Sequence, residues 1–87
     1  MTPQGVSRAL RARNVNVQSG EYATITVQKG GPTGVSVWVN DAILISSQVE
    51  RSLSAVEAAL GAAGYDHYRS RGGTSIYVKE RQVAVKR

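Results

Sequence analysis

The feature that most constrains the fold is a set of apolar residues spaced as on one face of a helix. They recur at alternating steps of four and three, the seam of an amphipathic helix, and are Val49, Leu53, Val56, Leu60 and Ala63. Ser47 and Glu50 fit a capping box at the start of this segment, and Gly64 is suited to stop it. We therefore predict a helix over residues 47–63, against which the rest of the chain must pack.

A second, shorter helix is predicted over residues 3–13. Thr2 is suited to cap it, and Pro3 fits the first helical position, where its missing N–H costs nothing. Asn14 is a plausible left-handed stop. One face of this helix is apolar and consists of Val6, Ala9 and Leu10.

Alternation of apolar and polar residues predicts strands in the remaining segments. We expect a short strand over residues 15–18, a hairpin formed by residues 22–29 and 35–39, and a last hairpin formed by residues 65–69 and 74–81. Residues 42–45 fit either a strand tail or a buried approach to the long helix. Residues 82–87 can extend the last strand, but we expect them to fray as a basic tail.

The two halves of the chain echo each other. Residues 6–27 and 56–78 share helix, stop and strand residues at offsets of 50 and then 51, although chance similarity remains an alternative. The predicted fold is α+β, in the order α-β-β-β-α-β-β, with one antiparallel sheet and both helices packed on one face. A chain of 87 residues is expected to form one domain.

The residue inventory argues against several kinds of chemistry. The chain has no cysteine, and its single histidine is His67, so we expect no metal site. His67 and Asp66 are neighbours on a predicted strand and point to opposite faces. No catalytic residue and no cofactor are predicted, and we expect a non-enzyme. No apolar run is long enough to span a membrane, so a cytoplasmic protein without a membrane partner is expected.

Positive charge gathers at the two ends of the chain. The net charge is +5, made up of +3 over residues 1–29, −2 over 30–64 and +4 over 65–87. This distribution suits a polyanionic partner, either nucleic acid or an acidic protein, although a solvated basic surface is an equally open reading. The candidate nucleic-acid-binding residues are Arg8, Arg11, Arg13, Arg69, Arg71, Lys79 and Arg81.

Aromatic residues supply a second candidate surface. Trp38 lies opposite the valine face of its predicted strand. If one face of the sheet is open, Trp38, Tyr22 and Tyr77 are expected to form an exposed patch for stacking on bases or for a protein partner. If the face is closed, residues 42–46 are expected to cover Trp38.

Residues 60–65 and 71–77 resemble part of the HicA-type mRNA interferase toxins: a helix ending in a glycine–aromatic pair, a strand, a glycine turn and an aromatic-bearing strand. The resemblance covers about a quarter of the chain and implies a double-stranded-RNA-binding-domain-like fold. That family cleaves mRNA with a histidine just after the turn glycine. Thr74 and Ser75 stand in that place here, so the resemblance does not carry over the catalytic group. The composition also looks like that of small uncharacterised proteins of actinobacteria and their phages, which implies no activity.

Three functions follow from these observations. The leading hypothesis is a small basic domain that binds RNA or DNA through the arginine-bearing hairpin and the first helix, whose cationic tips we expect to lie together on the rim of the sheet. The alternative is a protein-interaction module, such as a phage or mobile-element factor, that uses a sheet face or edge and forms a homodimer. A ribonuclease-like enzyme is the third.

Overall fold

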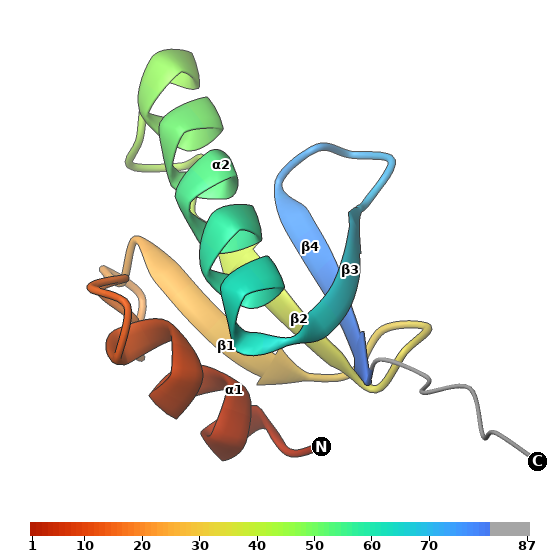
Figure 1. Cartoon of the computed structure of the whole chain (residues 1–87). Helices are drawn as coiled ribbons and strands as arrows, with labels where there is room; N and C mark the ends of the chain where they lie inside the picture. The colour runs from red at the N-terminus through yellow and green to blue at the C-terminus, as the bar shows by residue number, and fades with distance from the viewer. Residues whose placement is uncertain (81–87) are drawn as a thin grey trace, which may run out of the picture.

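The computed structural model describes residues 1–80; Arg81 and the predicted tail at 82–87 lie outside the described residues. Within this range the chain forms two helices and four strands in the order α-β-β-α-β-β (Figure 1). These are α1 (Pro3–Arg11), β1 (Ile25–Lys29), β2 (Val35–Val39), α2 (Ser46–Ala63), β3 (Tyr65–Arg69) and β4 (Ser75–Glu80).

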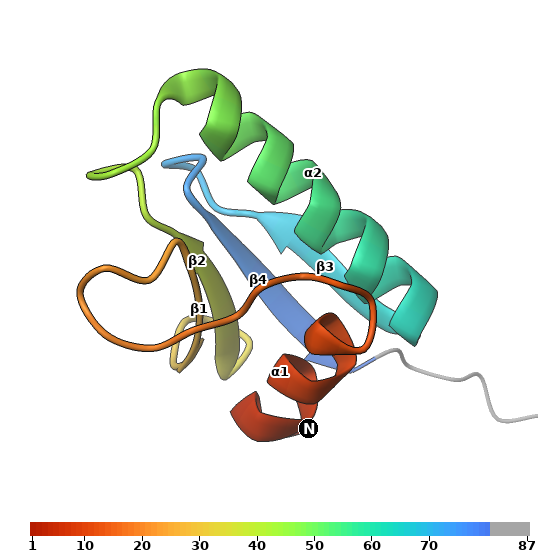
Figure 2. The same ribbon diagram turned by 90° about the vertical axis from the view of Figure 1, so that its left-hand side faces the viewer.

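The four strands form one sheet in the order β1-β2-β4-β3, and each neighbouring pair is antiparallel. Figures 1 and 2 show both helices on the same face of this sheet, with α1 beside β1. The longer helix α2 packs against β3 and also contacts β2 and β4. The predicted α+β class, with an antiparallel sheet and two helices on one face, is confirmed.

The long helix begins one residue earlier than the sequence indicated. Ile45 is the residue before its first turn, and the Gln48 side-chain oxygen accepts a hydrogen bond from the Ile45 N–H at 3.1 Å. The predicted capping box of Ser47 and Glu50 is therefore wrong, because a start at residue 46 moves the reciprocal position to Gln48. The predicted end is confirmed: Gly64 adopts a left-handed φ of 90° and passes the chain directly into β3.

The short helix has the predicted cap. Thr2 Oγ1 accepts a hydrogen bond from the Gly5 N–H at 3.0 Å, and Pro3 occupies the first turn. The helix ends at Arg11, two residues before the predicted end. Asn14 has a left-handed φ of 65°, as expected of a residue that turns the chain after a helix.

Residues 15–18 are not a strand, which corrects the sequence-based prediction. Val15 and Val17 are buried in the core, but the segment makes only one bond to β1, from Gln18 N to Ile25 O at 3.0 Å. Burial of alternate residues alone therefore produced a strand-like pattern. Residues 41–43 form a turn, so the ambiguous segment before α2 is not a strand tail. It leads into that helix but is not the buried approach expected, because Ile43 is 47% and Ile45 66% exposed.

The first predicted hairpin is also shorter than expected, because β1 begins at Ile25 and not at residue 22. The Asn40 side-chain amide explains this start. It donates to Glu21 O at 3.2 Å and to Ala23 O at 3.1 Å, and so holds residues 21–23 in a loop at the end of β2. Asn40 is itself 3% exposed, and these bonds satisfy its buried donor.

The core lies between the sheet and the helices. Its fully buried members come from the apolar stripes of both helices and from the two central strands, and they are Val6, Leu10, Val37, Val39, Leu53, Val56, Leu60, Ile76 and Val78. Val37 and Ile76 are cross-strand partners at the centre of the sheet, where the two halves of the chain meet. No Phe is present, and β-branched residues fill the sheet layer.

The two halves each read α-β-β, but their turns lie far apart. Because β2 and β4 are antiparallel, the β1–β2 turn and the β3–β4 turn lie at opposite ends of the sheet. The expectation that the cationic tips of the first helix and the last hairpin lie together is wrong, because Figure 1 shows α1 and the β3–β4 turn at opposite ends of the molecule. The residue alignment of the repeat is also wrong, since residues 25–27 lie in edge strand β1 and residues 76–78 in central strand β4.

Candidate functional site

One face of the sheet carries neither of the two described helices, and we call it the helix-free face. The apolar residues of β2 and β4 are buried toward the helices, so the alternate residues of each strand point the other way. By strand, the helix-free face consists of Thr26 and Gln28 of β1, Ser36 and Trp38 of β2, Ser75, Tyr77 and Lys79 of β4, and Asp66 and Tyr68 of β3.

Three aromatic side chains lie on this face, two of them on its central strands. Trp38 and Tyr77 are half-buried, whereas Tyr68 on the edge strand is 45% exposed. Tyr68 and Tyr77 are cross-strand partners, and their rings meet edge to face with centroids 5.2 Å apart and planes at 67°. Such T-shaped contacts are favourable and hold ring orientation. The three residues therefore form a partly fixed aromatic surface.

The glycine-rich β1–β2 turn closes over part of this surface. Gly31 has a φ of +80°, and a Cβ added to it would lie 3.2 Å from two ring carbons of Tyr77. Both the backbone conformation and the closeness of the ring favour glycine at this position. Tyr77 is thus held on one side by Tyr68 and on the other by a turn from a different strand pair.

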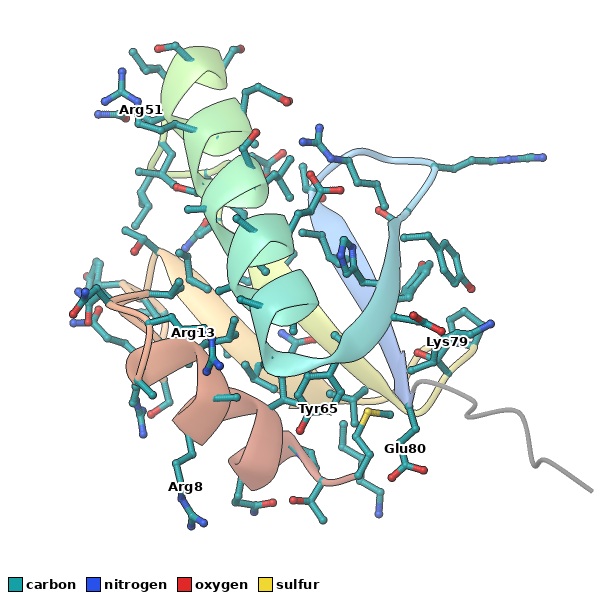
Figure 3. The ribbon with its side chains drawn as sticks, in the orientation of Figure 1. Arg8, Arg13, Arg51, Tyr65, Lys79 and Glu80 are labelled. Atoms are coloured by element: carbon teal, nitrogen blue, oxygen red, sulfur yellow. The ribbon has the colours of Figure 1, made fainter. Side chains whose placement is uncertain are left out.

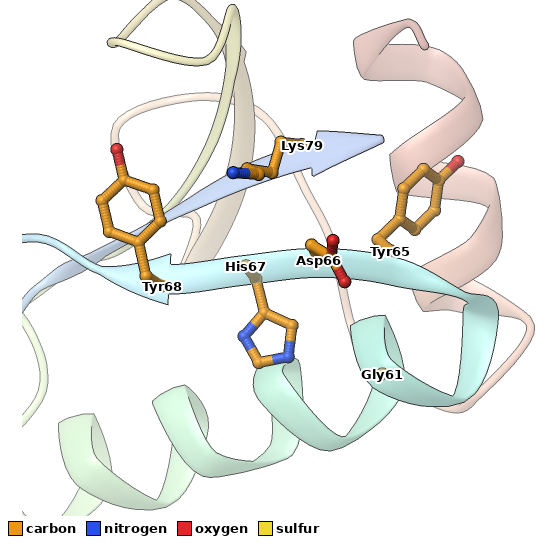
Figure 4. Close-up of a pocket in the computed structure, with 6 residues that line it drawn as sticks. All are labelled: Gly61, Tyr65, Asp66, His67, Tyr68 and Lys79. Carbon is orange, nitrogen blue, oxygen red and sulfur yellow. The ribbon is translucent and has the colours of Figure 1, made fainter. Parts of the chain in front are cut away.

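A shallow hollow of about 390 Å³ lies at the β3 edge of the sheet (Figure 4). Tyr68 and Lys79 border it on the helix-free side, while His67 points toward α2 beside Gly61. The prediction that Asp66 and His67 point to opposite faces is confirmed. His67 Nδ1 is buried and has no hydrogen-bond partner among the described residues.

Arg69, a predicted nucleic-acid contact, lies on the helix side of the sheet and binds two carboxylates of α2. It donates to Glu57 Oε1 through Nε at 3.0 Å and Nη2 at 2.7 Å, and to Glu50 Oε2 through Nη1 at 2.9 Å. The hydrogen bond and charge of Arg69 lower the pKa of Glu50, and both carboxylates raise the pKa of the guanidinium. Arg69 therefore ties β3 to α2, and its donors already face protein acceptors.

Arg11 at the end of α1 and Arg13 just after it also make hydrogen bonds to backbone oxygens of the chain. Arg11 donates through Nε and Nη2 to Val17 O at 3.2 and 3.0 Å, and Arg13 donates to Ala9 O at 3.2 Å and Ala62 O at 3.4 Å. Arg8 is exposed and lies with Arg11 along a groove between α1 and β1. Figure 3 shows Arg8 and Arg13 on the α1 side of the molecule, away from Lys79.

The remaining predicted residues divide between the face and its surroundings. Lys79 is exposed on the helix-free face, and Arg71 is exposed in the β3–β4 turn at the end of the sheet. Tyr22 is 79% exposed but lies in the loop before β1, outside the strands. The third aromatic residue of the helix-free face is therefore Tyr68, whereas we expected Tyr22 from the sequence. The alternation of residues 65–69 indicates that Tyr68 and Asp66 share a face, but only the register with β4 places Tyr68 beside Tyr77.

No family model, no characterised protein and no solved structure matches this chain. The resemblance to HicA-type toxins therefore stays a prediction. Within residues 1–80, no helix is long and apolar enough to cross a membrane. The same part of the chain holds no group of three histidine or acidic side chains placed to bind a metal ion.

Proposed function

We propose that this protein is a non-enzymatic nucleic-acid-binding domain, and that it holds single strands on its helix-free face. Trp38 and Tyr68 stack on bases, Tyr77 supports the Tyr68 ring from the neighbouring strand, and Lys79 contacts the phosphate backbone. One observation carries the proposal: three of the four aromatic residues of these strands, all except Tyr65, lie on the face that both helices leave uncovered. Aromatic side chains on a four-stranded sheet are an established way to bind single-stranded RNA.

The geometry favours single strands over duplexes. Bases offer their faces for stacking only when they are unpaired, and a broad sheet surface fits neither groove of a duplex well. Tyr68 is the most accessible of the three rings, and Lys79 lies two residues along β4 from Tyr77 on the same face. Arg71 extends the path beyond the sheet end. Arg69 is left out because its donors are bound to Glu50 and Glu57.

Trp38 provides a direct readout, because it is the only tryptophan of the chain and lies on the proposed face. Titration with short oligouridine or oligothymidine is expected to quench its fluorescence, and duplexes of equal length to quench it far less. Tyr68→Ala is expected to weaken single-strand binding by about 1–3 kcal/mol, the cost of losing one stacked base.

Tyr22→Ala is the matched control, because Tyr22 is a more exposed tyrosine outside the face. Equal loss of affinity in the two variants, or no quenching of Trp38 at low salt, would overturn the proposal.

A protein-interaction module remains the second candidate, favoured by the 45% exposure of Tyr68 on an edge strand of the sheet. Salt separates the two. Binding of several phosphates weakens steeply as salt rises, because condensed counterions are released. Capture of an acidic protein through an aromatic surface depends less on salt, because much of its free energy comes from apolar burial.

A further inference from the structure

The outer edge of β3 presents backbone groups that β4 does not bind. Ser70 N donates to Ser75 O at 2.8 Å, and bonded pairs alternate along an antiparallel ladder. The backbone groups of Asp66 and Tyr68 therefore face β4, whereas those of Tyr65, His67 and Arg69 point away from it. These three outward positions have no strand partner among the described residues.

The opposite edge of the sheet is treated differently. Residues 15–18 run beside β1, where Gln18 N bonds to Ile25 O at 3.0 Å, and Arg11 holds this segment by two hydrogen bonds to Val17 O. Up to residue 80, the second half of the chain supplies no such cover to β3, because Gly64 alone joins α2 to β3. Exposed strand edges readily pair with strands of other chains, and proteins commonly cover an edge where such pairing must be prevented.

The helix above the β3 edge leaves room for a neighbour. Ser54, Ala58 and Gly61 are exposed on α2, and Gly61 borders the hollow at the edge. No contact within residues 1–80 requires this glycine: an added Cβ would lie 3.9 Å from His67 Nε2, an ordinary contact, and the residue is helical. Glycine inside a helix is costly, so its presence here fits close approach of a second helix.

We propose that two copies of this chain associate through antiparallel pairing of their β3 strands, with His67 opposite its own counterpart on the two-fold axis. This register joins all five residues of β3 and places Tyr65 opposite Arg69. If one β3 strand is shifted by two residues in one direction, Asp66 of one copy lies opposite Asp66 of the other. Repulsion between these like charges disfavours that register. The resulting sheet is continuous across the two copies, and the exposed flanks of α2 face each other above it.

Cysteine cross-linking tests this register directly, because the native chain contains no cysteine. Directly opposed residues of a bonded antiparallel pair have Cα atoms about 5.5 Å apart, within the range that a disulfide spans. His67→Cys is therefore expected to form a disulfide-linked dimer under mild oxidation. Val27→Cys, at an outward position of the covered β1 edge, is the matched control and is expected to remain largely monomeric.

Sedimentation equilibrium of the unmodified chain supplies the second measurement. The chain is expected to show twice the monomer mass at high concentration, and His67→Pro to raise the dissociation constant about tenfold or more. Proline is tolerated where a strand N–H faces outward, so this variant removes edge pairing and keeps the β4 ladder, as circular dichroism would verify. A monomeric native chain, or equal cross-linking of both cysteine variants, would overturn the proposal.

Discussion

Arg69 of β3 binds one oxygen of Glu57 on α2 with two donors, Nε at 3.0 Å and Nη2 at 2.7 Å. A third donor, Nη1, binds Glu50 of the same helix. The sequence alone places Arg69 among the nucleic-acid contacts or on a solvated basic surface, and it does not indicate this contact with α2. The guanidinium of Arg69 joins β3 to α2. A binding partner must therefore use cations other than Arg69.

Replacing Arg69 tests that division of roles. Arg69→Met is expected to lower the melting temperature by several degrees, because Glu50 and Glu57 lose their shared cation. Its affinity for single strands is expected to stay unchanged. Arg71→Met is the matched variant, with unchanged melting and weaker binding, since Arg71 is exposed in the turn. Thermal melts and Trp38 titrations of both variants provide the check.

The same contact predicts how stability depends on acid. The hydrogen bond and charge of Arg69 hold the pKa of Glu50 below its ordinary value of about 4.3. A carboxyl group whose pKa is lower in the folded state stabilises the fold above its unfolded pKa, and this contribution is lost as pH falls through the folded pKa. The native chain is therefore expected to lose stability below about pH 4.3, and Glu50→Gln to lose less. Melting curves over this pH range measure the difference, and parallel losses in both proteins would contradict the assignment.

Lys79 is expected to contribute one phosphate contact. Lys79→Gln should weaken single-strand binding uniformly across sequences and reduce the slope of log K against log salt by about one. Lys29→Gln serves as its control, because Lys29 is an exposed lysine of β1 whose position in the strand alternation puts it on the opposite face. Salt titrations that give both variants the same slope would remove Lys79 from the interface.

The turn that closes over Tyr77 predicts a pair of glycine variants. Gly31→Ala is expected to destabilise the chain by about 1–2 kcal/mol through its left-handed backbone alone, and further through the 3.2 Å approach to the Tyr77 ring. Gly34→Ala shares the positive φ but meets no atom within 4 Å, so it isolates the backbone cost. Urea unfolding of both variants is the measurement. Equal losses would show that the ring contact carries no strain.

Gly61→Ala is expected to act in the opposite direction on the isolated chain. Alanine is favoured over glycine in a helix by about 1 kcal/mol, and the added Cβ meets His67 Nε2 at an ordinary 3.9 Å. At concentrations where the chain is monomeric, urea unfolding should therefore show a more stable protein. A destabilised variant would mean that the space beside His67 is tighter than the structure shows.

Local patterns were sufficient to predict the helices and the pairing of strands within each half. The alternation of Val35, Val37 and Val39 and the seam from Val49 to Ala63 both follow from burial of one face, which a sequence records directly. The same reasoning failed at Val15 and Val17. They are buried as a strand would bury them, but they lie in a loop, because burial periodicity does not reveal which backbone bonds are made.

The candidate site was only partly predictable for a related reason. Trp38 and Tyr77 were correctly placed on the face opposite the valines, since that follows from period-two alternation. Which ring lies beside Tyr77 depends on the register of β3 with β4, and the capture of Arg69 depends on how α2 crosses β3. Both are relationships between segments, and no local pattern contains them.

The central position of β4 has a consequence for how the chain reaches this fold. Strand β2 lies between β1 and β4, and its Val37 pairs with Ile76 of β4. One side of β2 therefore stays unpaired until β4, which ends at residue 80, has been synthesised. The α-β-β half that emerges first from the ribosome cannot complete its own sheet. Folding must therefore wait for contacts between residues far apart in sequence, which slows it and leaves a valine-rich strand open to wrong neighbours in the interval.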